Sequence, residues 1–161
     1  MTKIFSLLVI VVALSSCKIK TPTTTSNPNP DKGIEWLNTA SLSDAKQKSM
    51  VVNKLIFVDI GTDWCGYCKK MKKNVFPQEM ISTAINSNFV ALSLDGEKGD
   101  GAKLVSTLNL EGFPTQLVLD AKGNVVKRHT GYLSTNQLLS FLNCSHCKTL
   151  EIKESCPCYC F

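Results

Sequence analysis

The alternation of apolar and polar residues predicts one folded region, between residues 34 and 143, in which strands and helices alternate. Short apolar runs rich in β-branched residues predict strands at 55–60, 89–95, 115–120 and 125–131. Helical spacing of apolar residues predicts helices at 41–54, 65–74, 78–88, 102–110 and 134–142. This order predicts an α/β fold, with a mixed central sheet and helices on both of its faces.

The N-terminal segment has the pattern of an export signal. Lys3 precedes an apolar run from 4 to 14, and small residues and Cys17 follow. The run is too short to cross a bilayer comfortably, so residues 1–16 are predicted to be a signal peptide. The sequence Leu-Ser-Ser-Cys that ends at Cys17 resembles a bacterial lipobox, which implies cleavage before Cys17 and lipidation of its thiol. The alternative is an ordinary cleaved signal that a cysteine follows by chance.

Residues 17–33 are predicted to be the lipidated cysteine and a flexible tether. They are rich in Thr, Pro and Asn and lack apolar periodicity, so they have no core to bury. Acyl chains on Cys17 would hold the protein at a membrane surface, because each buried methylene contributes about 0.8 kcal/mol. The predicted location is therefore the bacterial cell envelope, with a lipid-anchored protein that faces the periplasm.

Length, charge and cysteine content narrow the classes of function. A chain of 161 residues holds one ordinary domain. The net charge of +5 is mild, and the basic cluster between residues 69 and 73 is too weak for a nucleic-acid surface, so no nucleic-acid partner is expected. Eight cysteines are many for a reducing cytosol, and they indicate an oxidising compartment or a metal.

The segment Asp-Trp-Cys-Gly-Tyr-Cys-Lys-Lys at 63–70 carries the strongest candidate chemistry. A helix that begins at Cys65 points free N–H groups and its positive end at that sulfur, which lowers the pKa of the thiol below about 8.5. Cys68 follows one turn later on the same face, where it can attack a mixed disulfide at Cys65 and release the reduced partner. A zinc site needs two more ligands, and none lies nearby in the sequence. A reactive dithiol is therefore favoured, and an inert disulfide remains the alternative.

Asp59 is an acidic residue inside the apolar run 55–60. A buried carboxyl has a raised pKa and can carry a proton near neutral pH. Because Asp59 lies six residues before Cys65, at the end of the strand that leads to the helix, we expect it to take the proton of Cys68. The alternative is an aspartate on the solvent side of an edge strand.

Three segments in this order resemble the signatures of the thioredoxin-fold family. They are residues 57–71, which hold the strand, Asp59, Trp64 and the Cys-x-x-Cys, residues 112–126, which begin Gly-Phe-Pro-Thr, and residues 130–142, which begin Thr-Gly-Tyr-Leu. The resemblance covers residues 34–143 and implies a thioredoxin fold for this domain. Within the superfamily, the chain is similar to periplasmic thioredoxin-like lipoproteins and to the C-terminal domain of transmembrane thiol-disulfide interchange proteins.

The resemblance implies roles for individual residues. Cys65 and Cys68 would be the catalytic dithiol, with Asp59 as the group that manages the proton. Pro114 would be a cis-proline that shapes a docking edge for the substrate, and Gly131 would let the partner chain approach closely. The residues implied in substrate contact are Trp64, Gly66, Tyr67, Phe113 and Thr115.

Two positions depart from thioredoxin itself. The dipeptide between the cysteines is Gly66-Tyr67 rather than Gly-Pro, and this dipeptide tunes the redox potential in the superfamily. The lysine that cytosolic thioredoxins place near the buried aspartate corresponds to Ala91. Asp59 would therefore be less stabilised as a carboxylate.

The implied function is that of a membrane-tethered thiol-disulfide oxidoreductase, which reduces or isomerises disulfides of exported proteins through Cys65 and Cys68. The dithiol is the redox group, so no cofactor is expected. The implied partners are protein thiols and disulfides, a membrane protein that donates electrons, and the membrane itself. The alternative is a lipoprotein that handles copper or zinc with its tail and uses the thioredoxin domain as a scaffold.

Residues 144–161 are predicted to form a cysteine-rich tail outside the resemblance. Its cysteines are Cys144, Cys147, Cys156, Cys158 and Cys160. Disulfides are typical of an exported protein, but five cysteines cannot all pair with one another. A Cys-x-x-Cys followed by Cys-x-Cys also offers enough thiolates for zinc or copper(I). The third hypothesis is a relay that passes electrons to or from the Cys65–Cys68 pair.

Overall fold

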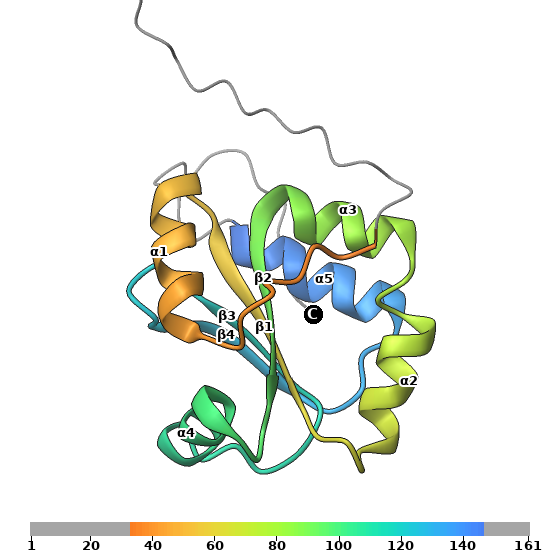
Figure 1. Cartoon of the computed structure of the whole chain (residues 1–161). Helices are drawn as coiled ribbons and strands as arrows, with labels where there is room; N and C mark the ends of the chain where they lie inside the picture. The colour runs from red at the N-terminus through yellow and green to blue at the C-terminus, as the bar shows by residue number, and fades with distance from the viewer. Residues whose placement is uncertain (1–32, 147–161) are drawn as a thin grey trace, which may run out of the picture.

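The computed structural model describes residues 33–146, in which four strands form one mixed sheet. The strands are β1 (Leu55–Gly61), β2 (Phe89–Asp95), β3 (Thr115–Leu119) and β4 (Val125–Thr130). In the spatial order β2-β1-β3-β4, β1 runs parallel to β2 and antiparallel to β3, and β4 is antiparallel to β3 (Figure 1). The four predicted strands are confirmed, each with ends within one residue of the predicted ones.

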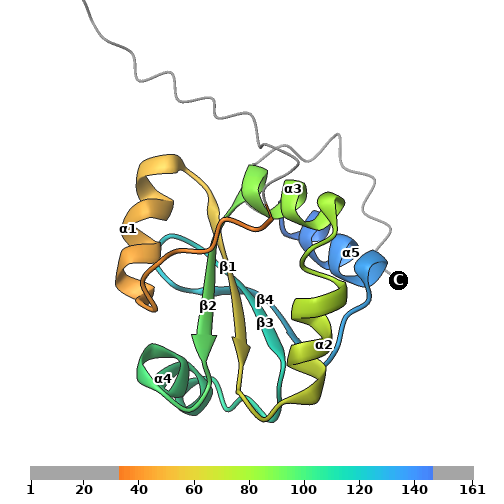
Figure 2. The same ribbon diagram turned by 45° about the vertical axis from the view of Figure 1, so that its right-hand side comes forward.

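Helices cover both faces of this sheet. Those in the described part of the chain are α1 (Leu42–Val52), α2 (Gly66–Asn74), α3 (Glu79–Asn88), α4 (Gly99–Thr107) and α5 (Thr135–His146). α1 and α4 lie on one face, and α2, α3 and α5 lie on the other (Figure 2). None of these described helices is long and apolar enough to cross a membrane. The predicted sheet between two helical layers is confirmed.

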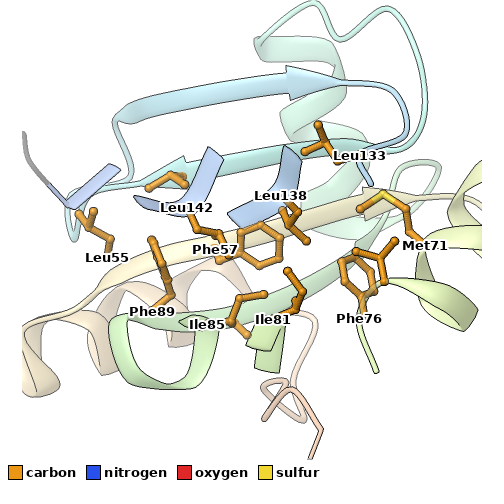
Figure 3. Close-up of a cluster of buried hydrophobic side chains, with 13 residues drawn as sticks. Leu55, Phe57, Met71, Phe76, Ile81, Ile85, Phe89, Leu133, Leu138 and Leu142 are labelled. Carbon is orange, nitrogen blue, oxygen red and sulfur yellow. The ribbon is translucent and has the colours of Figure 1, made fainter. Parts of the chain in front are cut away.

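β1 is the centre of the core, because all seven of its residues are buried. Ile56, Val58 and Ile60 pack toward α1 and α4, in a cluster that we call the α1–α4 face. Leu55 and Phe57 pack in the opposite cluster, the α2–α5 face (Figure 3), together with Met71, Phe76, Ile81, Ile85, Phe89, Leu133, Leu138 and Leu142. Each such side chain stabilises the fold by about 1.5–3 kcal/mol relative to an exposed one.

Local sequence signals set several helix ends. The side chain of Ser41 caps α1 and accepts a hydrogen bond from Asp44 N at 3.3 Å. Asn53 ends the same helix with a φ of 51°, in the left-handed region that asparagine tolerates. Before α5, the side chain of Gln137 accepts hydrogen bonds from the N–H and the hydroxyl of Ser134 at 2.9 and 2.7 Å. This is one half of a capping box and agrees with the predicted start of that helix.

In three helices, bounds differ from the predicted ones by more than one residue. α1 ends at Val52 rather than at residue 54, and α4 ends at Thr107 rather than at residue 110. α4 begins at Gly99 rather than at residue 102, because glycines that were expected in a loop pack inside the helix. A Cβ on Gly101 would lie 2.1 Å from the backbone oxygen of Asp95, so a glycine is needed for α4 to approach the end of β2. α5 continues to His146, so the segment predicted as a tail begins inside a helix.

An extended segment before α1 lies beside β2. Trp36 forms an isolated parallel bridge with Ala91, and Leu37 N–H donates to Ala91 O at 2.9 Å. The Trp36 ring contacts Phe57 and Phe76, with ring centroids 6.2 and 5.4 Å apart. This segment therefore adds aromatic contacts to the α2–α5 face ahead of the first helix.

Candidate active site

Cys65 and Cys68 form a disulfide at the N-terminus of α2. Cys65 is the N-cap residue of this helix, and its sulfur accepts a hydrogen bond from Cys68 N–H at 3.0 Å. The two cysteines are 5% and 2% exposed, so Cys68 is the deeper one. Once the disulfide is reduced, the sulfur of Cys65 therefore lies where free N–H groups and the positive helix end favour a thiolate.

Gly61, the last residue of β1, lies directly against Cys68. A Cβ on Gly61 would lie 3.1 Å from Cys68 Sγ, so the absence of a side chain leaves room for the sulfur. Asp59 points to the same face of β1, because side chains two residues apart on a strand share a face, about 6.6 Å apart. The strand thus places the carboxyl of Asp59 two residues before Gly61, behind the buried sulfur of Cys68.

Asp59 is 2% exposed and has an amide as its partner. β1 and β3 place it directly opposite Gln116, which is fully buried. Gln116 Nε2 donates to Asp59 Oδ1 at 3.2 Å and lies 3.4 Å from the sulfur of Met71. β1 is a central strand, so Asp59 is a buried carboxyl and not a solvated one on an edge strand.

Burial is the largest influence on the acidity of Asp59. It raises the pKa of this carboxyl from 3.8 to about 6, although the Gln116 hydrogen bond and the charge of Lys72 both lower it. Desolvation penalises the charged form, and one amide and one exposed ammonium offset only part of that penalty. Asp59 can therefore take up and release a proton close to neutral pH.

Aromatic side chains flank the disulfide on two sides. On the first side, Trp64 is 67% exposed, and its ring meets Phe113 edge-on with centroids 6.0 Å apart. Trp64 Nε1 also donates to Glu97 Oε1 at 3.0 Å. Phe113 packs on Gly96, where a Cβ would lie 2.4 Å from the ring. These contacts orient the Trp64 ring although most of its surface faces solvent.

On the second side, Tyr67 is 62% exposed and contacts Tyr132, with ring centroids 6.1 Å apart. The ammonium of Lys70 lies 4.7 Å from the centroid of the Tyr132 ring. Tyr132 follows Gly131, whose φ of 114° lies in the region that favours glycine. Exposed aromatic rings held by such contacts are suited to bind a partner chain, because they bury a large apolar area with little loss of freedom.

The turn into β3 carries the other predicted contact residues. The Phe113–Pro114 peptide bond is cis, as the resemblance implies. Gly131 N–H donates to Pro114 O at 2.7 Å and joins the two loops. Thr115 is fully buried, and its hydroxyl donates to Gly112 O at 2.7 Å. Because the Thr115 side chain is engaged inside the protein, its contact with a substrate would have to use the main chain.

The structure adds four residues to the predicted set: Gly61, Gly96, Gln116 and Tyr132. One of them had a signal in the sequence, because Gln116 is a polar residue inside the apolar run 115–120, just as Asp59 is inside 55–60. Two such residues on neighbouring strands predict a buried polar pair, since each needs a hydrogen-bond partner. The two glycines and Tyr132 had no comparable signal, because their contacts depend on which segments the fold brings together.

Several predicted features lie outside the described residues. Cys17 and the signal peptide precede the described region, and four tail cysteines follow it: Cys147, Cys156, Cys158 and Cys160. Cys144 belongs to α5. Within residues 33–146, no group of three or more His, Cys, Asp or Glu side chains could hold a metal ion. The lipid anchor and the three hypotheses for the tail therefore stay predictions.

Comparison with known proteins places this geometry in a family. Residues 42–146 match the family model described as a thioredoxin-like domain. The chain belongs to the thioredoxin-like domain family. Its fold is the thioredoxin fold, and it carries the Cys-x-x-Cys disulfide that is typical of a thiol-disulfide oxidoreductase of this family.

Individual relatives agree with this assignment. The thiol:disulfide interchange protein DsbD of Tatumella citrea is 28% identical over 116 residues, which are 70% of this chain and 20% of that protein. A protein of Bacteroides thetaiotaomicron, provisionally assigned as a disulphide-isomerase, has a solution structure with 32% identity and a TM-score of 0.64, covering 76% of this chain and 97% of that one. The oxidised C-terminal domain of Neisseria meningitidis DsbD shares the fold, with a TM-score of 0.55 and 19% identity over 68% of this chain and 97% of that one.

The match to the T. citrea protein supports the predicted similarity to thiol-disulfide interchange proteins, and the C-terminal domain of the N. meningitidis protein shares the fold. The chain spans a fifth of the length of the T. citrea protein, so it corresponds to one part of that relative. The activity of the complete relative is therefore no direct measure of what this chain does.

Proposed function

We propose that this chain is a membrane-tethered thiol-disulfide oxidoreductase that reduces or isomerises disulfides of exported proteins. The observation that carries the proposal is the Cys65–Cys68 disulfide at the N-terminus of α2, with Asp59 buried behind it. The similarity to proteins named as a thiol:disulfide interchange protein and a disulphide-isomerase supports the same activity. The dithiol itself is the redox group, and it exchanges electrons without an organic cofactor.

In the reducing direction, the thiolate of Cys65 attacks one sulfur of a substrate disulfide. A bond forms between Cys65 Sγ and that sulfur, the substrate disulfide breaks, and its other sulfur leaves as a thiolate. The N–H of Cys68, 3.0 Å from Cys65 Sγ, and the helix N-terminus stabilise the attacking thiolate. Trp64 and Tyr67 offer apolar surface to the substrate chain beside the sulfur.

Cys68 then resolves the mixed disulfide. Its thiol gives a proton to the carboxylate of Asp59, directly or through one water molecule, and the resulting thiolate attacks Cys65 Sγ. The Cys65–Cys68 bond forms, and the second substrate sulfur leaves as a thiolate that takes up a proton. Two electrons have then passed from the dithiol to the substrate. A dithiol on a membrane protein then reduces the Cys65–Cys68 disulfide by the same exchange steps in reverse, and so supplies two electrons for the next cycle.

The docking edge and the location complete the proposal. Phe113 and Pro114 line the edge on which the substrate chain lies, next to the Trp64 ring. The signal pattern of residues 1–16 supports export to the bacterial envelope, and the sequence that ends at Cys17 supports a lipid anchor there. A tether after the anchor lets the domain reach substrates away from the membrane surface.

The test of the activity is a pair of cysteine variants in the full chain. We expect Cys65→Ser to lose disulfide reductase activity by roughly 10³-fold or more, because the nucleophile is gone. We expect Cys68→Ser to accumulate a mixed disulfide with the substrate, visible by mass spectrometry without reductant. Cys160→Ser is the matched thiol control and should keep the activity. Full activity of Cys65→Ser would refute the proposal.

The anchor is tested separately in a bacterial host. We expect the wild-type chain to incorporate a fatty-acid label and to sediment with membranes. Cys17→Ser should lose the label, while Cys144→Ser, the matched control, should keep it. A wild-type chain that carries no label would refute the lipid anchor, and this result would not bear on the chemistry of the dithiol.

A further inference from the structure

Gln116 lies behind the disulfide and has no part in the steps proposed above. Its side chain is fully buried, and its Nε2 donates to Asp59 Oδ1 at 3.2 Å. The register of β1 and β3 places the two residues directly opposite each other. A buried amide in a core strand is unfavourable unless its polar atoms have partners, so its presence here needs an explanation.

The two polar atoms of this amide have different surroundings. Nε2 contacts Asp59 and the sulfur of Met71. Oε1 is buried and has no hydrogen-bond partner among the described residues. A glutamine amide exchanges its oxygen and nitrogen by a half-turn about its last bond. Such a half-turn brings the unused acceptor to the carboxyl.

Asp59 needs a different partner in each protonation state. A carboxylate only accepts hydrogen bonds, whereas a carboxylic acid also donates one. An amide serves both states, because its N–H donates and its oxygen accepts, while a lysine can only donate. Ala91 lies opposite Phe57 on β2, two positions from the partner of Asp59, and carries no polar group. Gln116 on β3 is the hydrogen-bond donor that faces the carboxyl.

We propose that Gln116 is a positioning residue for proton transfer at Asp59: its Nε2 donates to the carboxylate, and after a half-turn its Oε1 accepts from the carboxylic acid. This inference rests on the proposed function, in which Asp59 takes the proton of Cys68. Both states of Asp59 keep a hydrogen bond to the same residue. The carboxyl therefore keeps one orientation behind Cys68 while the proton arrives and leaves.

Titratable groups on α2 and β4 also face this pair. Lys72 of α2 acts on Asp59 through its charge, and Cys68 titrates when the disulfide is reduced. His129 of β4 lies opposite Gln116 in the strand register. Histidine is an ionisable residue, so the experiment includes a control variant at this position.

β2 contributes one further titratable group on this side. Ser93, directly opposite Asp59, does not titrate in this range. Asp95, opposite Gly61, forms an ion pair with Lys98 at 2.9 Å. Hydrogen bonds from Glu97 N–H and Lys98 lower the pKa of Asp95, so it stays charged while Asp59 titrates.

The test is an NMR titration of the full chain in detergent micelles, with the Cys65–Cys68 disulfide intact so that neither cysteine titrates. In the wild-type chain, we expect the side-chain amide signals of Gln116 to shift with the same midpoint as the carboxyl of Asp59. In Gln116→Met, of similar volume but without a donor, we expect the Asp59 midpoint to rise by about one pH unit, which is a tenfold tighter binding of the proton. The rise is expected because the variant loses a strong charge-assisted bond to the carboxylate but only a weaker neutral bond to the carboxylic acid. His129→Gln, the control, should leave that midpoint unchanged.

Two results would overturn the inference. One is that the chemical shifts of the Gln116 side-chain amide do not change while Asp59 titrates. This observation is made on the wild-type chain and needs no variant. The other is an unchanged Asp59 midpoint in Gln116→Met.

A kinetic measurement separates this inference from the proposed function. It follows how the rate at which Cys68 resolves a mixed disulfide at Cys65 depends on pH. We expect Asp59→Asn to remove one inflection from the curve of this rate against pH. Gln116→Met should move that inflection to higher pH, and the double variant should behave as Asp59→Asn. An unchanged profile in Asp59→Asn would refute the proton step of the proposed function, and the positioning role with it. A profile that responds to Asp59→Asn but not to Gln116→Met would refute the role of Gln116 alone.

Discussion

The two faces of β1 differ in composition: one is entirely apolar, and the other carries a polar residue beside the disulfide. On the α1–α4 face, Ile56, Val58 and Ile60 pack in a cluster of apolar side chains. On the α2–α5 face, Leu55 and Phe57 pack in the core, but the strand then continues with Asp59 and Gly61, a carboxyl and a missing side chain. The first face supplies stability. The second has fewer apolar contacts next to the disulfide, where it places a buried carboxyl and leaves room for a sulfur.

This difference is possible because the backbone pairing does not depend on the side chains. β1 is paired along its length with β2, and from Ile56 to Ile60 with β3, including the pairs that Asp59 makes with Ser93 and Gln116. A polar group on one face therefore leaves the sheet intact, provided that the group has a partner. The comparison of the two faces leads to four predictions.

The largest expected effect is on the α1–α4 face. Leu117 lies opposite Val58 on β3 and is fully buried. We expect Leu117→Ala to lower the free energy of unfolding by about 2–5 kcal/mol, because it removes apolar contacts and leaves a cavity. Denaturant unfolding measures this. The control Val125→Ala, at a residue 41% exposed, should change it by less than about 0.5 kcal/mol. A small loss for Leu117→Ala would contradict the structural role given to this face.

The second effect is a pH dependence that comes from the α2–α5 face. The pKa of Asp59 rises from 3.8 in the unfolded chain to about 6 in the folded one, so the folded state binds this proton more tightly. The stabilisation is fully present below about pH 4 and is lost as the pH rises through 6, and it amounts to roughly 3 kcal/mol. The free energy of unfolding of the wild-type chain should fall between pH 4 and 7 relative to that of Asp59→Asn. A constant difference between the two would show that Asp59 has an ordinary pKa.

The third effect is a gain in stability when the polar pair is removed as a unit. We expect Asp59→Leu combined with Gln116→Leu to raise the free energy of unfolding at pH 7 by about 1–3 kcal/mol, because neither position then buries a polar side chain. Gln116→Leu alone should destabilise the fold, since Asp59 loses its donor. Denaturant unfolding of the single and double variants measures both effects. A double variant less stable than the wild-type chain would mean that the pair stabilises this face.

The smallest effect on stability is expected at Trp64, whose ring lies exposed beside the disulfide. Trp64→Ala should change the free energy of unfolding by less than about 0.5 kcal/mol, because the ring is 67% exposed. It should lower kcat/KM for a protein disulfide roughly fivefold, which corresponds to about 1 kcal/mol of binding free energy. The kcat/KM for oxidised glutathione should stay nearly unchanged. Equal losses for both substrates would place Trp64 in the chemistry of the disulfide rather than in substrate binding.

Most of the fold was predictable because its signals are local. The strands are apolar runs bounded by turn residues, so their ends were predicted to within one residue. The start of α4 was wrong, because the glycine content of its first turn indicates a loop, while Gly101 is present for close packing against Asp95. A packing requirement of this kind has no counterpart in local sequence.

The candidate site was predictable in part for the same reason. Cys65 and Cys68 stand out by their spacing and by the helix that follows them, and Asp59 stands out as a charge in an apolar run. Trp64, Tyr67 and Phe113 were predicted as substrate contacts, and the Trp64 ring lies beside Phe113 while the Tyr67 ring lies beside Tyr132. Their contacts, however, join segments that the chain order alone does not pair.

By itself, the sequence determined the elements, the reactive spacing and the presence of a buried charge, because each depends on residues within a few positions of one another. The tertiary structure decided what the charge meets. Asp59 and Gln116 are 57 positions apart, and they are partners because β3 pairs antiparallel with β1 in one particular register. A shift of that register by one residue would turn Gln116 to the α1–α4 face and leave Asp59 without its donor.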